Sequence, residues 1–275
     1  MQNAAIASLG LNWRYLAFEV HPDDLRPALE GARRMHFLGI NLTVPHKLLA
    51  VEMMDVLDDS AKVWGAVNTV RFEGKDQRGE WRPLREFSEA PSELRSHGFN
   101  TDADAITRAL RDDLGLELAG KSILLLGAGG AGRTAALKLA SEQVAQLFLV
   151  NRTQTKAVLV ASEIAARHPK VKVVLGYPNG KVDLLLNATS LGLNSADSLP
   201  FDGTQFSLSR SEVVYDMIYR PAETPLLKMA KAAGCRTANG VGMLLYQGAR
   251  ALEIWMGEPA PIQVMRRALE QMVRA

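Results

Sequence analysis

A glycine-rich segment between two apolar runs constrains the fold of this chain more than any other feature. Residues 123–153 are ILLLGAGGAGRTAALKLASEQVAQLFLVNRT, an order that predicts a strand, a tight turn, a helix and a second strand. Glycines in the G-x-G-x-x-G spacing let the backbone approach a pyrophosphate at the helix N-terminus. The turn therefore predicts dinucleotide binding, although a glycine-rich turn without a cofactor is the alternative. The predicted contacts are Gly127, Ala128, Gly129, Gly130, Ala131 and Gly132.

The end of the second strand indicates which dinucleotide is bound. NAD-binding folds usually place an acidic residue there to bind the ribose 2′-hydroxyl. This chain has Asn151, Arg152 and Thr153 instead, and Lys156 follows closely. A guanidinium can hold a 2′-phosphate with two parallel hydrogen bonds, whereas a carboxylate would repel it. We therefore predict that the cofactor is NADP.

Composition excludes several classes of protein. The chain has 275 residues, which suggests two domains, and a net charge of +2, which is too small to indicate a nucleic-acid partner. A single cysteine, Cys235, excludes a disulfide framework within one chain, and no metal-ligand cluster is evident. The sequence contains neither a signal peptide nor an apolar run long enough for a membrane helix. We expect a cytoplasmic protein that binds neither nucleic acid nor a membrane, and the sequence leaves open whether it is a monomer or a homodimer.

The second half of the chain alternates predicted strands and helices, which is typical of a parallel sheet covered on both faces. Strands are expected at residues 123–127, 147–150, 171–175, 182–187 and 213–218, with a weaker one near 236–238. In the first part, residues 13–20 alternate as a strand does, and residues 73–96 suggest a long solvated loop or hairpin extension. The fold class is therefore α/β, with a Rossmann-type doubly wound nucleotide-binding domain beside a second α/β domain.

Three polar residues stand out in the first part of the chain. Pro45 suits the start of a helix that continues through LLAVEMMDVL, which places the Lys47 ammonium unfavourably near the positive end of the helix dipole. A solvated surface lysine is the alternative. Asp102 precedes a predicted helix and is either an N-cap or a carboxylate ready to pair with a cation. Asn68 lies in a predicted strand, where asparagine is rare, so its amide is expected to contact a ligand or a neighbouring loop.

Several motifs together resemble the shikimate dehydrogenase family over nearly the whole chain. They are NLTVPHK at 41–47, GAVNTV at 65–70, GFNTD at 98–102, GAGGAGR at 127–133, NRT at 151–153, NATSLG at 187–192, YDMIYRPAETPLL at 215–227 and NGVGMLLYQGA at 239–249. The resemblance implies reversible, NADP-dependent reduction of 3-dehydroshikimate to shikimate in aromatic amino-acid biosynthesis. It also implies a discontinuous substrate domain, residues 1–102 plus 240–275, and an NADP domain, residues 103–239.

The resemblance also implies roles for individual residues. Lys47 and Asp102 correspond to the catalytic pair, in which the ammonium delivers a proton to the ketone oxygen while nicotinamide supplies the hydride. The implied substrate contacts are Asn41, Thr43, Asn68, Tyr219 and Gln247. The implied cofactor contacts beyond the glycine turn and Arg152 are Thr189, Met217, Gly240 and Met243. Two alternatives stay open: a quinate/shikimate dehydrogenase of relaxed specificity, and a non-catalytic NADP-binding homologue.

The start of the chain departs from the family pattern. The family's opening strand and serine-rich substrate motif precede the M-x-N of the first helix, and this chain begins with Met1-Gln2-Asn3. Because those serines bind the substrate carboxylate in the family, we expect the chain as given to bind NADPH but to handle shikimate poorly. Either Met1 is an internal methionine of a longer natural protein, or the chain is naturally short with a damaged shikimate site.

Overall fold

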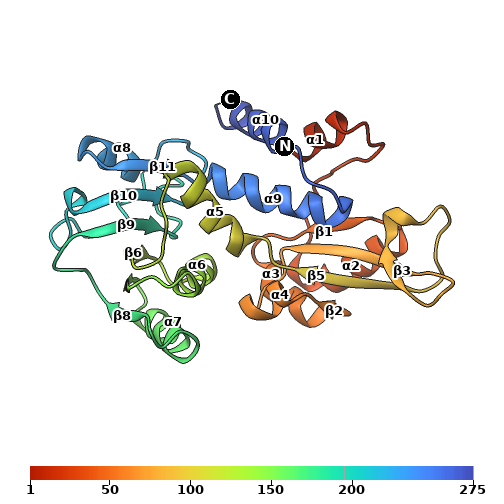
Figure 1. Ribbon diagram of the computed structural model, residues 1–275, viewed down its shortest axis with the longest axis horizontal. Coiled ribbons are helices and arrows are strands. Elements are labelled where there is room, and N and C mark those ends of the chain that lie inside the picture. The colour runs from red at the N-terminus through yellow and green to blue at the C-terminus, as the bar shows by residue number, and fades with distance from the viewer. Residues whose placement is uncertain (195, 275) are drawn as a thin grey trace. The chain divides into compact units, whose positions relative to one another are not determined.

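The computed structural model describes residues 1–194 and 196–274, and the chain divides into two compact units. Unit 1 comprises Met1–Asp102 and Gln247–Ala268, and unit 2 comprises Ala103–Tyr246 and the end of the chain from Leu269. The chain returns to unit 1 inside one long helix, α9 (Val241–Met256), after Tyr246 (Figure 1). Each unit contains one sheet.

Unit 2 is built on a six-stranded sheet with the order β11-β10-β9-β6-β7-β8, in which every pairing is parallel. On one side of β6 lie β7 and then β8. On its other side lie β9, β10 and β11, in that order, which gives the doubly wound arrangement. The strands are β6 (Ser122–Leu126), β7 (Gln146–Val150), β8 (Lys172–Leu175), β9 (Val182–Asn187), β10 (Ser211–Asp216) and β11 (Arg236–Asn239). All six predicted strands are therefore confirmed, the weak one included.

Burial explains why these strands could be predicted from apolar runs in the sequence. The side chains of Ile123, Leu124, Leu125 and Leu126 are all fully buried, as expected for a central parallel strand with both faces covered. The helices that precede or connect these strands along the chain are α5 (Asp102–Leu114), α6 (Gly130–Ser141), α7 (Gln154–Arg167) and α8 (Pro225–Ala232). The last helix of the chain is α10 (Ile262–Arg274). A 3₁₀ turn, η4 (Leu208–Arg210), leads into β10.

Unit 1 is built on a five-stranded mixed sheet with the order β1-β3-β5-β2, and β4 also pairs with β3. The strands are β1 (Gly39–Asn41), β2 (Val56–Leu57), β3 (Thr69–Lys75), β4 (Trp81–Pro83) and β5 (Leu94–Phe99). The helices and 3₁₀ turns are α1 (Gln2–Ser8), η1 (Pro22–Asp24), α2 (Leu25–Arg34), α3 (His46–Leu49), η2 (Ala50–Met53), α4 (Asp59–Trp64) and η3 (Leu84–Glu86). Leu25 and Leu29 of α2 pack into a core with Val70 and Phe72 of β3.

Two local predictions in unit 1 are wrong, and a third is right only in part. The strand expected at residues 13–20 is absent, because this segment pairs with no strand in the described part of the chain. The helix expected to run from Pro45 through residue 57 ends at Leu49, because Val56 and Leu57 pair with β5 instead. Residues 73–96 form a hairpin extension, as one of the two readings had it, but they are not a solvated loop: Glu73 and Leu84 are buried.

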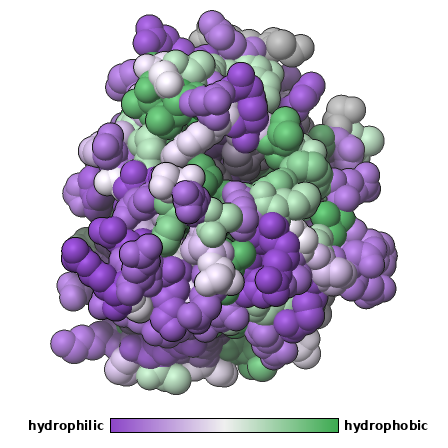
Figure 2. All heavy atoms as spheres, turned by 90° about the vertical axis from the view of Figure 1, so that its right-hand side faces the viewer, coloured by the Kyte–Doolittle hydropathy of each residue, from purple (hydrophilic) through white to green (hydrophobic). Residues whose placement is uncertain are grey.

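One face of the molecule carries both hydrophilic and hydrophobic side chains. Hydrophilic side chains cover most of the face shown in Figure 2, with hydrophobic ones in small groups between them. Within residues 1–194 and 196–274, no helix is long and apolar enough to cross a membrane. The same ranges contain no cluster of three or more His, Cys, Asp or Glu side chains arranged to hold a metal ion.

Candidate active site

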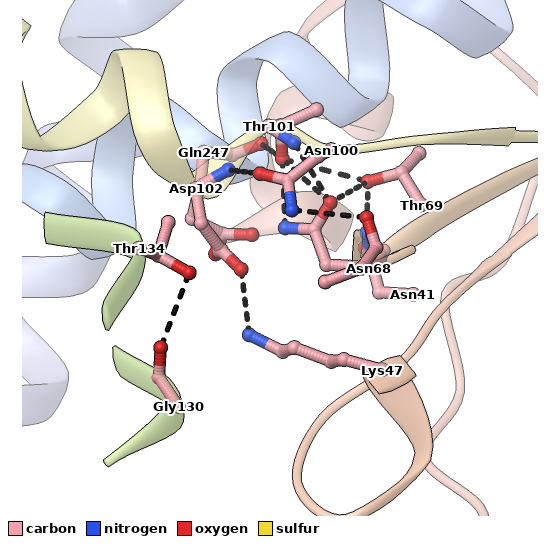
Figure 3. Close-up of polar contacts among 11 residues, drawn as sticks. Asn41, Lys47, Asn68, Thr69, Asn100, Thr101, Asp102, Gly130, Thr134 and Gln247 are labelled. Atoms are coloured by element: carbon pink, nitrogen blue, oxygen red, sulfur yellow. Dashed lines mark hydrogen bonds and ion pairs between the residues drawn. The ribbon is translucent and has the colours of Figure 1, made fainter. Parts of the chain in front are cut away.

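Lys47 and Asp102 form an ion pair in unit 1 (Figure 3). Lys47 lies on the short helix α3, and Asp102 is the first residue of α5. The lysine Nζ lies 2.8 Å from Oδ2 of the aspartate, and the two side chains are 27% and 13% exposed. An ammonium carries three donor hydrogens, and this bond uses one of them. The ammonium is therefore held in place while it retains the capacity to donate to a ligand.

Backbone and side-chain hydrogen bonds hold the two ends of this pair. The carbonyl oxygen of Lys47 accepts from Val67 N at 2.8 Å. Asp102 N donates to Asn100 Oδ1 at 3.1 Å, and Asn100 Nδ2 donates to the carbonyl oxygen of Ala66 at 3.0 Å. Both partners are thus tied to the segment that leads into β3, which limits how far the ammonium and the carboxylate can separate.

Asn68 is the centre of a buried polar cluster beside this pair. It directly precedes β3 and is 1% exposed. Its Oδ1 accepts from Thr101 N at 2.8 Å and from Thr69 Oγ1 at 3.1 Å, and its Nδ2 donates to Thr101 Oγ1 at 3.0 Å. Thr101 Oγ1 in turn donates to the carbonyl oxygen of Gln247 on α9 at 3.0 Å. The unusual asparagine next to a strand therefore contacts the loop that carries Asp102.

The other predicted substrate contacts occupy different positions. The Asn41 side chain, at the end of β1, donates to the carbonyl oxygen of Asn68 and to Thr69 Oγ1, so it lies in the same cluster. Thr43 is exposed in the turn before α3. Tyr219 belongs to unit 2, where it follows β10 and is 40% exposed. Unit 1 therefore contains all the predicted substrate contacts except Tyr219.

Three polar residues of this cluster were not singled out as ligand contacts from the sequence. Thr69, Asn100 and Thr101 are all buried and all hydrogen-bonded within the cluster. A signal was available: the dipeptide Asn-Thr occurs both at 68–69, in a predicted strand, and at 100–101, just before a predicted helix. Because β3 and β5 pair antiparallel with Thr69 opposite Phe99, these two dipeptides meet.

In unit 2, the glycine-rich turn follows β6 and leads into α6. Gly127 has a φ of +103°, a conformation that side chains disfavour. A Cβ on Gly132 would lie 2.2 Å from the carbonyl oxygen of Gly127, so only glycine allows this close approach of helix and turn. No side chain caps α6 at Gly129, and a Cβ on Gly129 or Gly130 would meet nothing within 4 Å. The turn thus presents open space at an uncapped helix N-terminus, an arrangement that fits a pyrophosphate.

The end of β7 lies beside this turn. Asn151 Oδ1 accepts from Ala128 N at 2.9 Å, and its Nδ2 donates to the carbonyl oxygen of Thr153. Arg152, Thr153 and Lys156 are exposed, and neither cation forms an ion pair within the described residues. Arg133, the other cation near the turn, is instead held by Glu163 of α7 at 2.6 Å. Arg152 and Lys156 are therefore the cations available to a 2′-phosphate.

The remaining predicted cofactor contacts lie at the carboxyl ends of β9, β10 and β11. Thr189 N and Oγ1 donate to Asn187 Oδ1, and a Cβ on Gly127 would lie 3.0 Å from Thr189 Cγ2. Gly240 packs so closely on Met217 that a Cβ would lie 2.0 Å from the Met217 carbonyl oxygen. Met243 is half-buried in the first turn of α9. In a doubly wound sheet, ligands bind at this edge, where the strand order reverses between β6 and β9.

A buried carboxylate supports the same edge. Asp216, the last residue of β10, accepts from Asn187 Nδ2 at 3.0 Å, from Thr224 Oγ1 at 2.6 Å and from Ile218 N at 3.1 Å. Burial raises the pKa of the Asp216 carboxyl, and these hydrogen bonds offset the effect only in part. The cluster ties the ends of β9 and β10 to the segment before α8.

Comparison with known proteins identifies the family. Residues 1–70 match the shikimate dehydrogenase substrate binding domain, residues 109–190 match shikimate / quinate 5-dehydrogenase, and residues 240–270 match the shikimate 5′-dehydrogenase C-terminal domain. Shikimate dehydrogenase (NADP(+)) from Methanopyrus kandleri is 38% identical over 281 aligned positions, which cover 100% of this chain and 90% of that protein.

Solved structures agree with the sequence matches. A shikimate dehydrogenase in complex with NADP+ superposes with a TM-score of 0.83 at 34% identity and covers 99% of this chain and 89% of its own. The ligand-free 5-ketofructose reductase of Gluconobacter superposes with a TM-score of 0.79 at 32% identity and covers 98% of this chain and 91% of its own. The matches over the whole length, together with the glycine turn and the motifs around Lys47 and Asp102, show that this chain belongs to the shikimate dehydrogenase family.

Proposed function

We propose that this protein is an NADP-dependent shikimate dehydrogenase, which reduces 3-dehydroshikimate to shikimate reversibly. The observation that carries the proposal is the 2.8 Å ion pair between Lys47 and Asp102, set beside a buried cluster of amide and hydroxyl groups in a member of this family. Residues 1–102 and 240–275 are assigned to the substrate and residues 103–239 to NADP.

The chain's own residues account for the proton half of the reaction. Reduction of a ketone builds negative charge on its oxygen, so a proton donor must lie within hydrogen-bond reach of that atom. The Lys47 ammonium donates a hydrogen bond to the oxygen; its N–H bond then breaks as the new O–H bond of the alcohol forms. The neutral amine left behind regains a proton from solvent. Bound NADPH supplies the hydride that goes to the carbonyl carbon.

Asp102 keeps the ammonium oriented during this transfer. A long lysine side chain has many rotamers, and an ion pair to the largely buried carboxylate of Asp102 selects the one that directs Nζ to the substrate. Asn68 and Gln247 are assigned to the substrate hydroxyls, with Asn41 and Thr43 as further contacts from unit 1. Tyr219 is assigned to the substrate from unit 2.

The cofactor assignment rests on unit 2. The turn Gly127–Gly132 is assigned to the pyrophosphate, because its uncapped helix N-terminus offers backbone N–H groups to an anion. Arg152 and Lys156 are assigned to the 2′-phosphate, with Asn151 and Thr153 positioning the loop. Thr189, Met217, Gly240 and Met243, at the carboxyl edge of the sheet, are assigned to the rest of the cofactor.

A second candidate is the reduction of another polyhydroxylated ketone. The specific observation in its favour is the 32% identity and full-length superposition with a 5-ketofructose reductase. Lys47 and Asp102 would perform the same proton transfer on such a substrate, since the chemistry at the carbonyl is unchanged. The substrate's ring substituents, and not the reaction type, separate the two candidates.

A substrate and cofactor panel tests the proposal. The purified protein is assayed for oxidation of shikimate and quinate with NADP+ and with NAD+, and for reduction of 5-ketofructose with NADPH. We expect the highest kcat/KM for shikimate with NADP+. A higher kcat/KM for 5-ketofructose would favour the second candidate, and binding of NADPH without turnover of any of these substrates would contradict both.

A further inference from the structure

A directed chain of hydrogen bonds crosses unit 1 and passes through Asn68. It begins at the Tyr15 hydroxyl, which donates to Asn41 Oδ1 at 2.9 Å. Its later steps are drawn in Figure 3. They run from Asn41 Nδ2 to Thr69 Oγ1 at 3.0 Å, from Thr69 Oγ1 to Asn68 Oδ1 at 3.1 Å, from Asn68 Nδ2 to Thr101 Oγ1 at 3.0 Å, and from Thr101 Oγ1 to the Gln247 carbonyl oxygen at 3.0 Å.

Backbone groups fix the direction of the first half of this chain. Asn41 Nδ2 lies 3.1 Å from the carbonyl oxygen of Asn68, which can only accept. The amide nitrogen of Asn41 must therefore face β3, and its oxygen must face Tyr15. With Asn41 in this orientation, Thr69 Oγ1 accepts from Asn41 and is left with its own hydrogen for Asn68 Oδ1.

Backbone groups fix the second half in the same way. The backbone N–H of Thr101 can only donate, and it lies 2.8 Å from Asn68 Oδ1. The carbonyl oxygen of Gln247 can only accept, so Thr101 Oγ1 must donate to it and accept from Asn68 Nδ2. The Asn68 oxygen is thus occupied by donors on the Thr69 and Thr101 sides. Its Nδ2 carries two hydrogens, and the bond to Thr101 uses one.

Tyr15 is itself held firmly at the start of the chain. Its backbone N and O both bond to the side-chain amide of Asn3 on α1, at 2.8 and 2.9 Å. Its ring lies 6.2 Å from that of Trp255 on α9. Burial raises the pKa of the Tyr15 hydroxyl, which keeps it protonated and able to donate. The donor at the head of the chain therefore has a defined position.

We propose that Tyr15 is a positioning residue for the substrate: through Asn41 and Thr69 it reinforces the backbone contacts that orient the Asn68 amide, so that Asn68 presents N–H, and not C=O, to a substrate hydroxyl oxygen. The proposal rests on the proposed function, because it assigns Asn68 to a substrate hydroxyl. It adds two residues, Tyr15 and Thr69, that act through Asn68 without contacting the substrate. It also makes the site selective for a ring substituent that accepts a hydrogen bond.

The kinetic test compares Tyr15→Phe with Tyr177→Phe as a matched control. Tyr177, in unit 2, loses a hydroxyl that accepts from Asp202 N at 2.8 Å. For Tyr15→Phe we expect KM for shikimate to rise about three- to tenfold, the effect of one hydrogen bond, with KM for NADP+ unchanged and kcat within about twofold. For Tyr177→Phe we expect all three to stay at the unaltered values.

Substitution of Thr69 breaks the hydrogen-bond chain at two bonds, and a serine at the same position restores the hydroxyl. Thr69→Val keeps the shape of the side chain but removes both the acceptor for Asn41 and the donor for Asn68, so KM for shikimate should rise more than tenfold. Thr69→Ser restores the hydroxyl and should return KM to within about threefold. Equal losses in the Val and Ser variants would overturn the proposal, as would an unchanged KM in Tyr15→Phe.

Substrate analogues distinguish a loss of Asn68 orientation from a general disturbance of the fold. The variants are assayed with shikimate analogues in which one non-reacting hydroxyl is replaced by hydrogen. For the analogue that lacks the hydroxyl bound by Asn68, Tyr15→Phe and the unaltered protein should have the same KM. The same fold-increase with every analogue would show that the hydroxyl of Tyr15 acts on the fold as a whole and would overturn the proposal.

A measurement without substrate keeps the inference separate from the proposed function. Exchange with solvent of the Asn68 side-chain amide hydrogens is followed by NMR in the full chain. Tyr15→Phe and Thr69→Val should speed this exchange, whereas Tyr177→Phe should not. If the unaltered protein turned over no shikimate, the proposed function would be contradicted. The exchange measurement would still test whether Tyr15 and Thr69 restrain the Asn68 amide, because it needs no substrate. Unchanged exchange in both variants would overturn the proposal.

Discussion

Glu73 is a buried carboxylate whose charge should stabilise unit 1 in a pH-dependent way. It lies on β3 with a side chain that is only 2% exposed. Its oxygens accept from Arg71, from Arg95 at 2.6 Å and from His97 Nδ1 at 3.1 Å. Burial by itself would raise the pKa of Glu73, but the hydrogen bonds from His97, Arg71 and Arg95 outweigh it and lower the pKa from 4.5 to about 2.

The size and the pH window of the effect follow from this pKa. A lowering from 4.5 to about 2 corresponds to about 3 kcal/mol of unfolding free energy at pH 7. Because the folded state holds the proton less tightly than the unfolded state, the contribution is complete above about pH 5. It is lost as the pH falls from 4.5 towards 2, and about half of it should remain at pH 3.

The perturbation is Glu73→Gln, followed by urea unfolding at pH 7 and at pH 3. All four tryptophans, Trp13, Trp64, Trp81 and Trp255, lie in unit 1, so tryptophan fluorescence reports the unfolding of this unit. We expect the variant to lose about 3 kcal/mol at pH 7, and the difference from the unaltered protein to shrink to about 1.5 kcal/mol at pH 3.

Glu93→Gln is the matched control for this measurement. Glu93 pairs with Lys75 at 3.2 Å but is 60% exposed, so the same chemical change should cost less than about 1 kcal/mol. The reasoning would be refuted if both variants lost equal stability at pH 7. It would also be refuted if the difference between Glu73→Gln and the unaltered protein stayed constant with pH.

Three further predictions concern the proposed catalytic and cofactor sites. Lys47→Ala should lower kcat for shikimate oxidation by about a hundredfold or more while KM changes little, because the proton transfer is made only in the transition state; near-full turnover in steady-state assays would end the acid–base assignment. Arg152→Ala should weaken NADPH binding about ten- to a hundredfold and leave NADH binding unchanged, as a titration of each would show, since a charged hydrogen bond contributes about 1.5–3 kcal/mol. Gly132→Ala should destabilise unit 2 in thermal unfolding because its Cβ would lie 2.2 Å from the Gly127 carbonyl oxygen, whereas Gly130→Ala, whose Cβ meets nothing within 4 Å, should be tolerated.

Local patterns in the sequence determined the architecture of unit 2. Its strands are short apolar runs bounded by turn residues, and the run before Gly127 is fully buried on both faces. Such signals lie within a few residues of each other, so they can be recognised without knowledge of the rest of the fold. The expected strands, their alternation with helices and the glycine turn were therefore all predictable. The family was identified from the resemblance of several motifs.

In unit 1, pairing between distant segments determined the secondary structure at the positions where local patterns were misleading. Residues 13–20 alternate as a strand does, but a strand exists only where a partner supplies hydrogen bonds, and none is present in the described chain. Residues 56–57 continue an apparently helical pattern, yet they pair with β5. Glu73 appeared to begin a solvated loop, but β3 extends through it and brings it opposite Arg95.

The candidate active site shows the same division in finer detail. The sequence named Lys47, Asn68, Asp102 and Gln247 through motifs, because each motif is a contiguous stretch. It could not place them together, since Lys47 and Asp102 are 55 residues apart and Thr101 and Gln247 are 146 apart. The antiparallel register of β3 and β5, with Thr69 opposite Phe99, brings the two Asn-Thr dipeptides into contact. Tyr15 and Thr69 acquire their partners only from this register and from the packing of α1 and α9, because the direction of a side-chain hydrogen bond depends on neighbours that tertiary structure alone supplies.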